Sequence, residues 1–93
     1  MKRIAVIGAG AMGSGIGQVA AMAGHEVILF DAFPNAVTKA RDAILLSLNK
    51  LAEKGKITDQ ETKAVFGRMY FVDQLQSIEG SDLVIEAIVE IEE

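Results

Sequence analysis

The stretch VIGAGAMGSGIGQ, residues 6–18, places five glycines among thirteen residues. Glycine weakens helices and strands because it loses the most backbone entropy on folding, so this density indicates a backbone that needs the missing side chains. Gly8, Gly10 and Gly13 form the pattern G-x-G-x-x-G. In that pattern the first glycine permits a tight turn, the second lets the backbone approach a pyrophosphate, and the third lets a helix pack closely on a strand. The predicted cofactor-binding residues of this loop are Gly8, Ala9, Gly10, Ala11, Met12 and Gly13.

The segments around the loop have the patterns of a strand, a helix and a second strand. Residues 2–7 are rich in β-branched and apolar side chains, which is typical of a strand. Apolar residues then recur at helical spacing to about residue 23, and Gly24 provides a stop. They are Met12, Ile16, Val19, Ala20 and Ala23. Residues 26–31 are nearly all apolar, as in a parallel strand covered on both faces. This context predicts that the loop binds the pyrophosphate of a dinucleotide at the N-terminus of the helix.

Asp31 ends the second predicted strand, eighteen residues after Gly13. A carboxylate at this place accepts hydrogen bonds from both hydroxyls of an adenosine ribose and repels a 2′-phosphate, so it favours NAD over NADP. Ala32 follows, with no arginine at hand to hold a 2′-phosphate. FAD sites have the same glycine pattern. In an alternative role, Asp31 would be a turn or helix-capping residue ahead of Pro34.

The remaining segments alternate between helical and strand patterns. Pro34 predicts the first turn of a long helix, which Gly55 ends. The buried stripe of this helix would be Val37, Ala40, Ile44, Leu48 and Leu51. Residues 58–61, TDQE, have the form of a capping box, so a short helix should follow to about residue 66. Residues 69–72 and 82–88 are the third and fourth predicted strands, joined by a turn or a short helix.

This order of elements predicts an α/β fold. We expect a Rossmann-type parallel sheet with a glycine-rich βαβ unit, right-handed crossovers, and a two-helix arm between the second and third strands. Such a sheet normally has two halves, so residues 1–93 are expected to be the N-terminal part of an NAD-binding domain, truncated after the fourth strand, without the second half of the sheet or a substrate and dimerisation domain. The open edge of that strand predicts a homo-oligomer. The alternative is a naturally small four-stranded domain that dimerises through the edge.

Composition excludes several classes of function. The chain is 51% apolar with a net charge of −4, which argues against disorder and against nucleic acid as a partner. Without cysteine it has no thiolate metal site and no thiol nucleophile, and a cytoplasmic location is compatible with this. No apolar run reaches the length of a membrane span, so no membrane partner is expected. The single histidine, His25, falls in a turn opposite the glycine loop, and we assign no catalytic residue and no metal site.

A second set of polar residues lies on the long helix. Ser47, Lys50 and Lys54 occupy positions i, i+3 and i+7, on one face and away from the apolar stripe. A hydroxyl beside a row of ammonium groups suits a polyphosphate ligand. The same pattern is also that of an ordinary solvated helix face.

The chain resembles the 3-hydroxyacyl-CoA dehydrogenases, including the short-chain 3-hydroxybutyryl-CoA enzymes of fatty acid metabolism, over essentially its whole length. The resemblance rests on VIGAGAMGSGIGQVAAMAGHEVILFD (residues 6–31), LLSLNKLAEKGKI (45–57) and SDLVIEAIVE (81–90). The first segment resembles many dehydrogenases, whereas the other two, at these distances, are more particular to this family.

The resemblance implies roles for individual residues. It implies that the glycine loop and Asp31 hold NAD, that Glu90 also contacts NAD, and that Ser47 and Lys54 face the coenzyme A of an acyl-CoA substrate. It also implies a dimeric parent enzyme. The chain departs from the family at Ile91, where Asn or Asp is common. The family's catalytic histidine and the glutamate that orients it belong to later segments, so we expect the 93-residue chain to bind NAD without turnover.

Two other functions fit the same residues. An NAD-sensing regulatory module would bind the cofactor and change its association state without chemistry. A β-hydroxyacid dehydrogenase of the 6-phosphogluconate type has a similar G-x-G-x-M-G start, but is not expected to carry a helical arm with Ser47 and Lys54.

Overall fold

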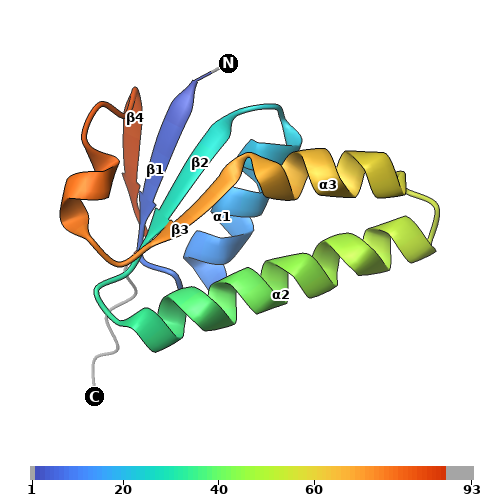
Figure 1. Cartoon of the computed structure of the whole chain (residues 1–93), viewed down its shortest axis with the longest axis horizontal. Coiled ribbons are helices and arrows are strands. Elements are labelled where there is room, and N and C mark those ends of the chain that lie inside the picture. The colour runs from blue at the N-terminus through green and yellow to red at the C-terminus, as the bar shows by residue number, and fades with distance from the viewer. Residues whose placement is uncertain (1, 88–93) are drawn as a thin grey trace.

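The computed structural model describes residues 2–87. In it, helices pack on a parallel four-stranded sheet (Figure 1). The elements in chain order are β1 (Arg3–Ile7), α1 (Ala11–Met22), β2 (Glu26–Phe30), α2 (Pro34–Glu53), α3 (Asp59–Gly67), β3 (Met69–Val72), the 3₁₀ helix η1 (Leu75–Ile78) and β4 (Leu83–Glu86). The strand order is β3-β2-β1-β4, and all neighbours are parallel. The predicted α/β fold is confirmed, including the two-helix arm between β2 and β3.

The helices α1, α2 and α3 cover one face of the sheet. Side chains alternate along a strand, and those of one face join the helices in a single buried cluster. The sheet contributes Ile4, Val6, Val27, Leu29 and Met69 to it. The opposite face carries Ala5, Ile28 and Phe30, which are also buried, and η1 contacts β2 there. The α-helices of the first two crossovers therefore lie on one face, and η1, in the crossover from β3 to β4, lies on the other.

The long helix α2 follows its predicted pattern. Val37, Ala40, Ile44 and Leu48 are buried and Leu51 is half-buried. Gly55 adopts a positive φ of 72° just after the C-terminus, as a glycine stop requires. At the start of α3, Thr58 and Glu61 form the predicted capping box, with hydrogen bonds of 2.9 and 3.0 Å. In Figure 1, α3 runs back alongside α2, and the ends of both helices extend beyond the sheet.

The buried face of α1 matches the predicted one only in part: Ile16 and Ala20 of the stripe pack against the buried cluster. The apolar spacing correctly indicated a helix, but Met12 and Val19 of that stripe are 54% and 69% exposed. The sheet is instead contacted by the small residues Gly13, Gly17 and Ala21. The reason is close approach: a Cβ on Gly17 would lie 3.4 Å from Val27 Cγ1 and from Met69 Cε, so larger residues do not fit between α1 and the sheet.

Arg68 ties the far end of α1 to the sheet. Its guanidinium donates from Nε and Nη2 to the carbonyl oxygen of Ala21, at 3.0 and 2.7 Å. This carbonyl lies in the last turn of α1, where it also accepts the backbone N–H of Gly24 at 3.1 Å. Arg68, the residue just before β3, therefore helps to cap a helix at a carbonyl 47 positions earlier in the sequence.

Within residues 2–87, no helix combines the length and the apolar character that crossing a bilayer requires.

Two glycines of α1 give a matched test of this packing. A methyl group on Gly13 would overlap the carbonyl oxygen of Gly8, whereas one on Gly15 would meet no atom within 4 Å. We predict that Gly13→Ala lowers the free energy of unfolding by about 1–3 kcal/mol through overpacking. Gly15→Ala should raise it by about 0.5–1 kcal/mol, because alanine favours the helix. Urea unfolding of both variants measures this. Equal stability of the two variants would contradict the close contact between Gly8 and α1.

Candidate functional site

The glycine loop and Asp31 lie together at the carboxyl edge of the sheet. Register pairing sets Ile7 opposite Phe30 on one side and opposite Glu86 on the other, so β1, β2 and β4 end level with one another. The strand order reverses at β1, because β2 and β4 flank it on opposite sides. In open parallel sheets this switch point is where ligands bind.

The loop turns sharply from β1 into α1. Gly8 has a φ of 110°, a conformation that favours glycine, and its N–H donates to the carbonyl of Phe30 at 2.8 Å. Gly13 then passes so close to the Gly8 carbonyl that no side chain fits between them. These contacts explain the first and third glycines of the motif by backbone geometry.

The N-terminus of α1 is open to an anion. Gly10 is its N-cap, no side chain caps it, and no acidic residue stands in its first turn. By contrast, α3 begins with a capping box and two acidic residues, Asp59 and Glu61. The first-turn amides of α1 therefore have no intrahelical acceptor, and the helix dipole adds partial positive charge beside them. A Cβ on Gly10 would meet no atom within 4 Å, so the space above the loop is free for a phosphate group.

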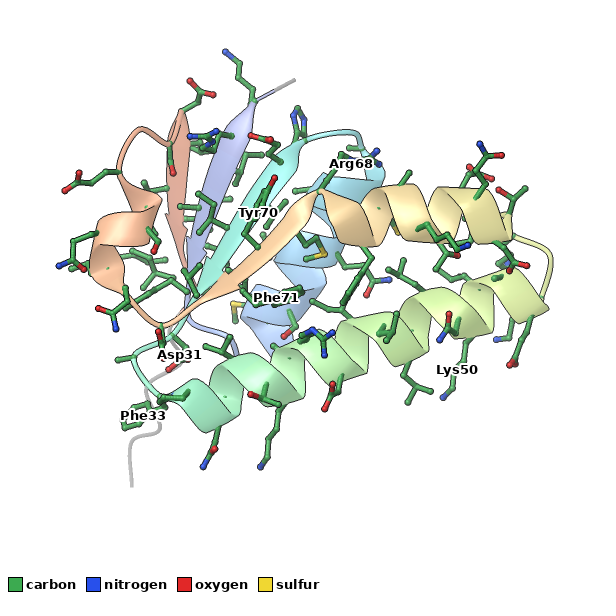
Figure 2. All side chains as sticks on the ribbon, in the orientation of Figure 1. Asp31, Phe33, Lys50, Arg68, Tyr70 and Phe71 are labelled. Atoms are coloured by element: carbon green, nitrogen blue, oxygen red, sulfur yellow. The ribbon has the colours of Figure 1, made fainter. Side chains whose placement is uncertain are left out.

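The Asp31 carboxylate connects the loop to the segment before α2. Its Oδ2 accepts a hydrogen bond from the Ala9 N–H at 2.9 Å, and its Oδ1 accepts one from the Phe33 N–H at 2.9 Å. The second bond is a turn contact, so the alternative role considered for Asp31 is present in the fold (the side chain is labelled in Figure 2). A carboxylate has about four acceptor positions, and two remain for a pair of ribose hydroxyls.

A groove of about 530 Å³ runs from the loop between α1 and α2. The loop and α1 line it with Gly10, Ser14 and Gln18, while Lys39 and Ala40 of α2 line the other side. Lys39 and Gln18 had no role in the sequence-based prediction. Helical spacing alone marks Gln18 as lying on the same side of α1 as Ser14, but only the packing of α2 brings both to the groove.

The three polar residues of α2 do not share one environment. Ser47 is half-buried and accepts a hydrogen bond from Gln18 Nε2 at 3.1 Å, so it faces α1, and the alternative of an ordinary solvated helix face does not hold for this residue. Lys50 and Lys54 are exposed, and Figure 2 shows Lys50 pointing away from α3. Lys54 is the C-cap of α2, far along the arm from the glycine loop.

Other candidates fall outside the described site. Glu90 lies outside the described residues. His25 is half-buried, and its Nδ1 accepts a hydrogen bond from the backbone N–H of Lys2 at 3.1 Å. Residues 2–87 contain no cluster of three potential metal ligands among His, Cys, Asp and Glu.

Comparison with known proteins shows which family has this sequence and this fold. The family described as "3-hydroxyacyl-CoA dehydrogenase, NAD binding domain" matches residues 3–93. A probable 3-hydroxybutyryl-CoA dehydrogenase of Deinococcus radiodurans is 47% identical over 88 residues, which cover 95% of this chain and 31% of the relative. A 3-hydroxybutyryl-CoA dehydrogenase of Mycobacterium tuberculosis is 40% identical over 90 residues, 97% of this chain and 32% of the relative.

Solved structures agree with these sequence matches. The crystal structure of 3-hydroxybutyryl-CoA dehydrogenase from Escherichia coli K12 superposes with a TM-score of 0.91 at 40% identity, covering 97% of this chain and 19% of that one. The chain thus spans about a third, or less, of the length of the proteins it matches.

The two hydrogen bonds of Asp31 generate a stability prediction. In Asp31→Asn one acceptor oxygen becomes a donor that faces a backbone N–H, so we expect the free energy of unfolding to fall by about 1–3 kcal/mol. Asp73→Asn is the matched control, because Asp73 is exposed and makes no side-chain hydrogen bond or ion pair within residues 2–87. Urea unfolding of both variants measures the difference. If both variants are as stable as the parent chain, Asp31 does not hold the two loops together.

Proposed function

The chain belongs to the 3-hydroxyacyl-CoA dehydrogenase family through its NAD binding domain, and we propose that it holds NAD and part of an acyl-CoA for an NAD-dependent 3-hydroxyacyl-CoA dehydrogenase. Proteins named 3-hydroxybutyryl-CoA dehydrogenase among its relatives support 3-hydroxybutyryl-CoA as the kind of substrate. The family match favours this activity over the 6-phosphogluconate type of dehydrogenase.

One observation carries the proposal. The Asp31 carboxylate lies 2.9 Å from the Ala9 N–H of the glycine loop, so the acceptor for a ribose sits beside the donors for a pyrophosphate. One dinucleotide needs the carboxylate and the loop to be this close, because its adenosine ribose and its pyrophosphate are directly linked. We assign Gly8, Ala9, Gly10, Ala11, Met12 and Gly13 to the pyrophosphate, and Asp31 to the adenosine ribose. Glu90, outside the described residues, is proposed as a further NAD contact.

The described residues are proposed to bind and orient the ligands, and we assign none of them as a base. NAD, when bound, accepts a hydride at its nicotinamide ring, and in the proposed reaction that hydride comes from C3 of a 3-hydroxyacyl-CoA. The amides of α1 and the Asp31 carboxylate would fix where the cofactor lies along the carboxyl edge of the sheet. The proton of the 3-hydroxyl would pass to a base other than the residues assigned above.

The arm formed by α2 and α3 is proposed to hold coenzyme A. Ser47 contacts α1 through Gln18, and Lys54, the C-cap of α2, lies two turns further along the arm. A hydroxyl and an ammonium spaced along one helix suit the phosphates of coenzyme A, which are spread over an extended ligand.

We further propose a homo-oligomer, dimeric in the whole enzyme, and a cytoplasmic location. The first is supported by β4, an edge strand of the described sheet on which Leu83 and Val84 are 52% and 47% exposed. An apolar edge strand of this kind is usually covered by further chain or by a partner.

Lysine variants on the arm test the proposed function. We predict that Lys54→Ala weakens binding of coenzyme A about twofold to fivefold, the range for one solvent-exposed ionic contact, and leaves NADH binding unchanged. Lys63→Ala is the matched control, because Lys63 is also exposed but lies on α3. Calorimetric titration of each variant with coenzyme A and with NADH gives both affinities. A parent chain that binds NADH but not coenzyme A would favour the NAD-sensing module instead.

A further inference from the structure

A half-buried hydrogen bond joins α1, the helix that follows the glycine loop, to α2 of the arm. Gln18 Nε2 of α1 donates to Ser47 Oγ of α2 at 3.1 Å, and both residues are half-buried. The two residues are 29 positions apart in the sequence, so the bond depends on tertiary packing rather than on local helix geometry. Gln18 also lines the groove that begins at the glycine loop.

The direction of this bond decides what Ser47 can offer to a ligand. A serine hydroxyl has one proton to donate and two acceptor positions. Because the Gln18 amide donates to the oxygen, one acceptor position is occupied while the proton remains available. Ser47 can therefore donate to a ligand oxygen while it is held by Gln18.

Other hydroxyls on the helices of this chain show what Ser47 does not do. Thr38 donates to the carbonyl of Pro34 at 3.2 Å, and Thr62 donates to the carbonyl of Thr58 at 3.1 Å. These are the usual bonds back to the preceding helical turn. Within residues 2–87, Ser47 makes no such bond, and its one side-chain hydrogen bond is the one it accepts from Gln18. Its proton is thus not consumed by its own helix.

We propose that Gln18 is a positioning residue that holds the Ser47 hydroxyl as a hydrogen-bond donor toward an acceptor oxygen of coenzyme A. The inference rests on the proposed function, because it needs Ser47 to contact coenzyme A. It adds a residue of α1 to the coenzyme A site proposed on the arm. Gln18 itself touches neither ligand; it acts through Ser47.

A double-mutant cycle in the whole chain tests the proposal, with coenzyme A and NADH as the probes. Gln18→Met keeps the length of the side chain and removes the amide donor, and Ser47→Ala removes the hydroxyl. We expect Gln18→Met to weaken coenzyme A binding about threefold to tenfold, the effect of one lost hydrogen bond. In the Ser47→Ala background the same Gln18 change should have no further effect. The NADH affinity of the single Gln18 variant should stay near that of the parent, whereas a general disturbance of α1 would weaken the binding of both ligands.

The outcomes separate this inference from the proposed function. If Ser47→Ala weakens coenzyme A binding but Gln18→Met does not, the positioning role is wrong and the proposed function stands. An equal loss from Gln18→Met with and without Ser47 also overturns the positioning role, because Gln18 would then act by itself. If the parent chain and Ser47→Ala bind coenzyme A equally, the assignment of Ser47 fails, and the role of Gln18 fails with it.

Discussion

The carboxylate of Asp31 accepts one backbone N–H from each of two loops, that of Ala9 after β1 and that of Phe33 before α2. Both bonds have a charged acceptor, which makes them stronger than bonds between neutral groups. The helices α1 and α2 begin directly after these loops, so the start of the groove between them depends on this one side chain. The residue proposed to read the ribose is therefore also the residue that positions the donors for the pyrophosphate.

Close packing of α1 extends that constraint along the helix. Gly13 lies against the Gly8 carbonyl and Gly17 lies against side chains of β2 and β3, so α1 packs close to the sheet. In this position Gln18 reaches α2 and donates to Ser47. Arg68, the residue just before β3, donates to the Ala21 carbonyl at the far end of the same helix. Cofactor loop, helix and arm are thus connected through one element, and the arm residues have a fixed place relative to the loop.

Much of this arrangement follows from the sequence, where local chemistry decides it. The glycine spacing, the capping box at Thr58 and the apolar stripe of α2 each predict an element that the structure contains. Prediction from the sequence was wrong or incomplete where tertiary packing determines which residues are in contact. Met12 and Val19 have helical spacing, yet the glycines of α1 face the sheet. The sequence alone does not show whether a glycine in a helix is a close packing contact or a residue on an exposed face. The Gln18–Ser47 bond and the place of Lys39 in the groove need the packing of α1 on α2, which no local pattern contains.

We propose that the Asp31 carboxylate and the glycine loop together bind the adenosine ribose of NAD beside its pyrophosphate. The most direct measurement is a parallel titration of the chain with NADH and with NADPH, following nicotinamide fluorescence. We expect NADH to bind more tightly by a factor of about ten or more, a difference of about 1.4 kcal/mol, because a 2′-phosphate would face the carboxylate. Equal affinity for the two cofactors would contradict it, since Asp31 would then not contact the ribose.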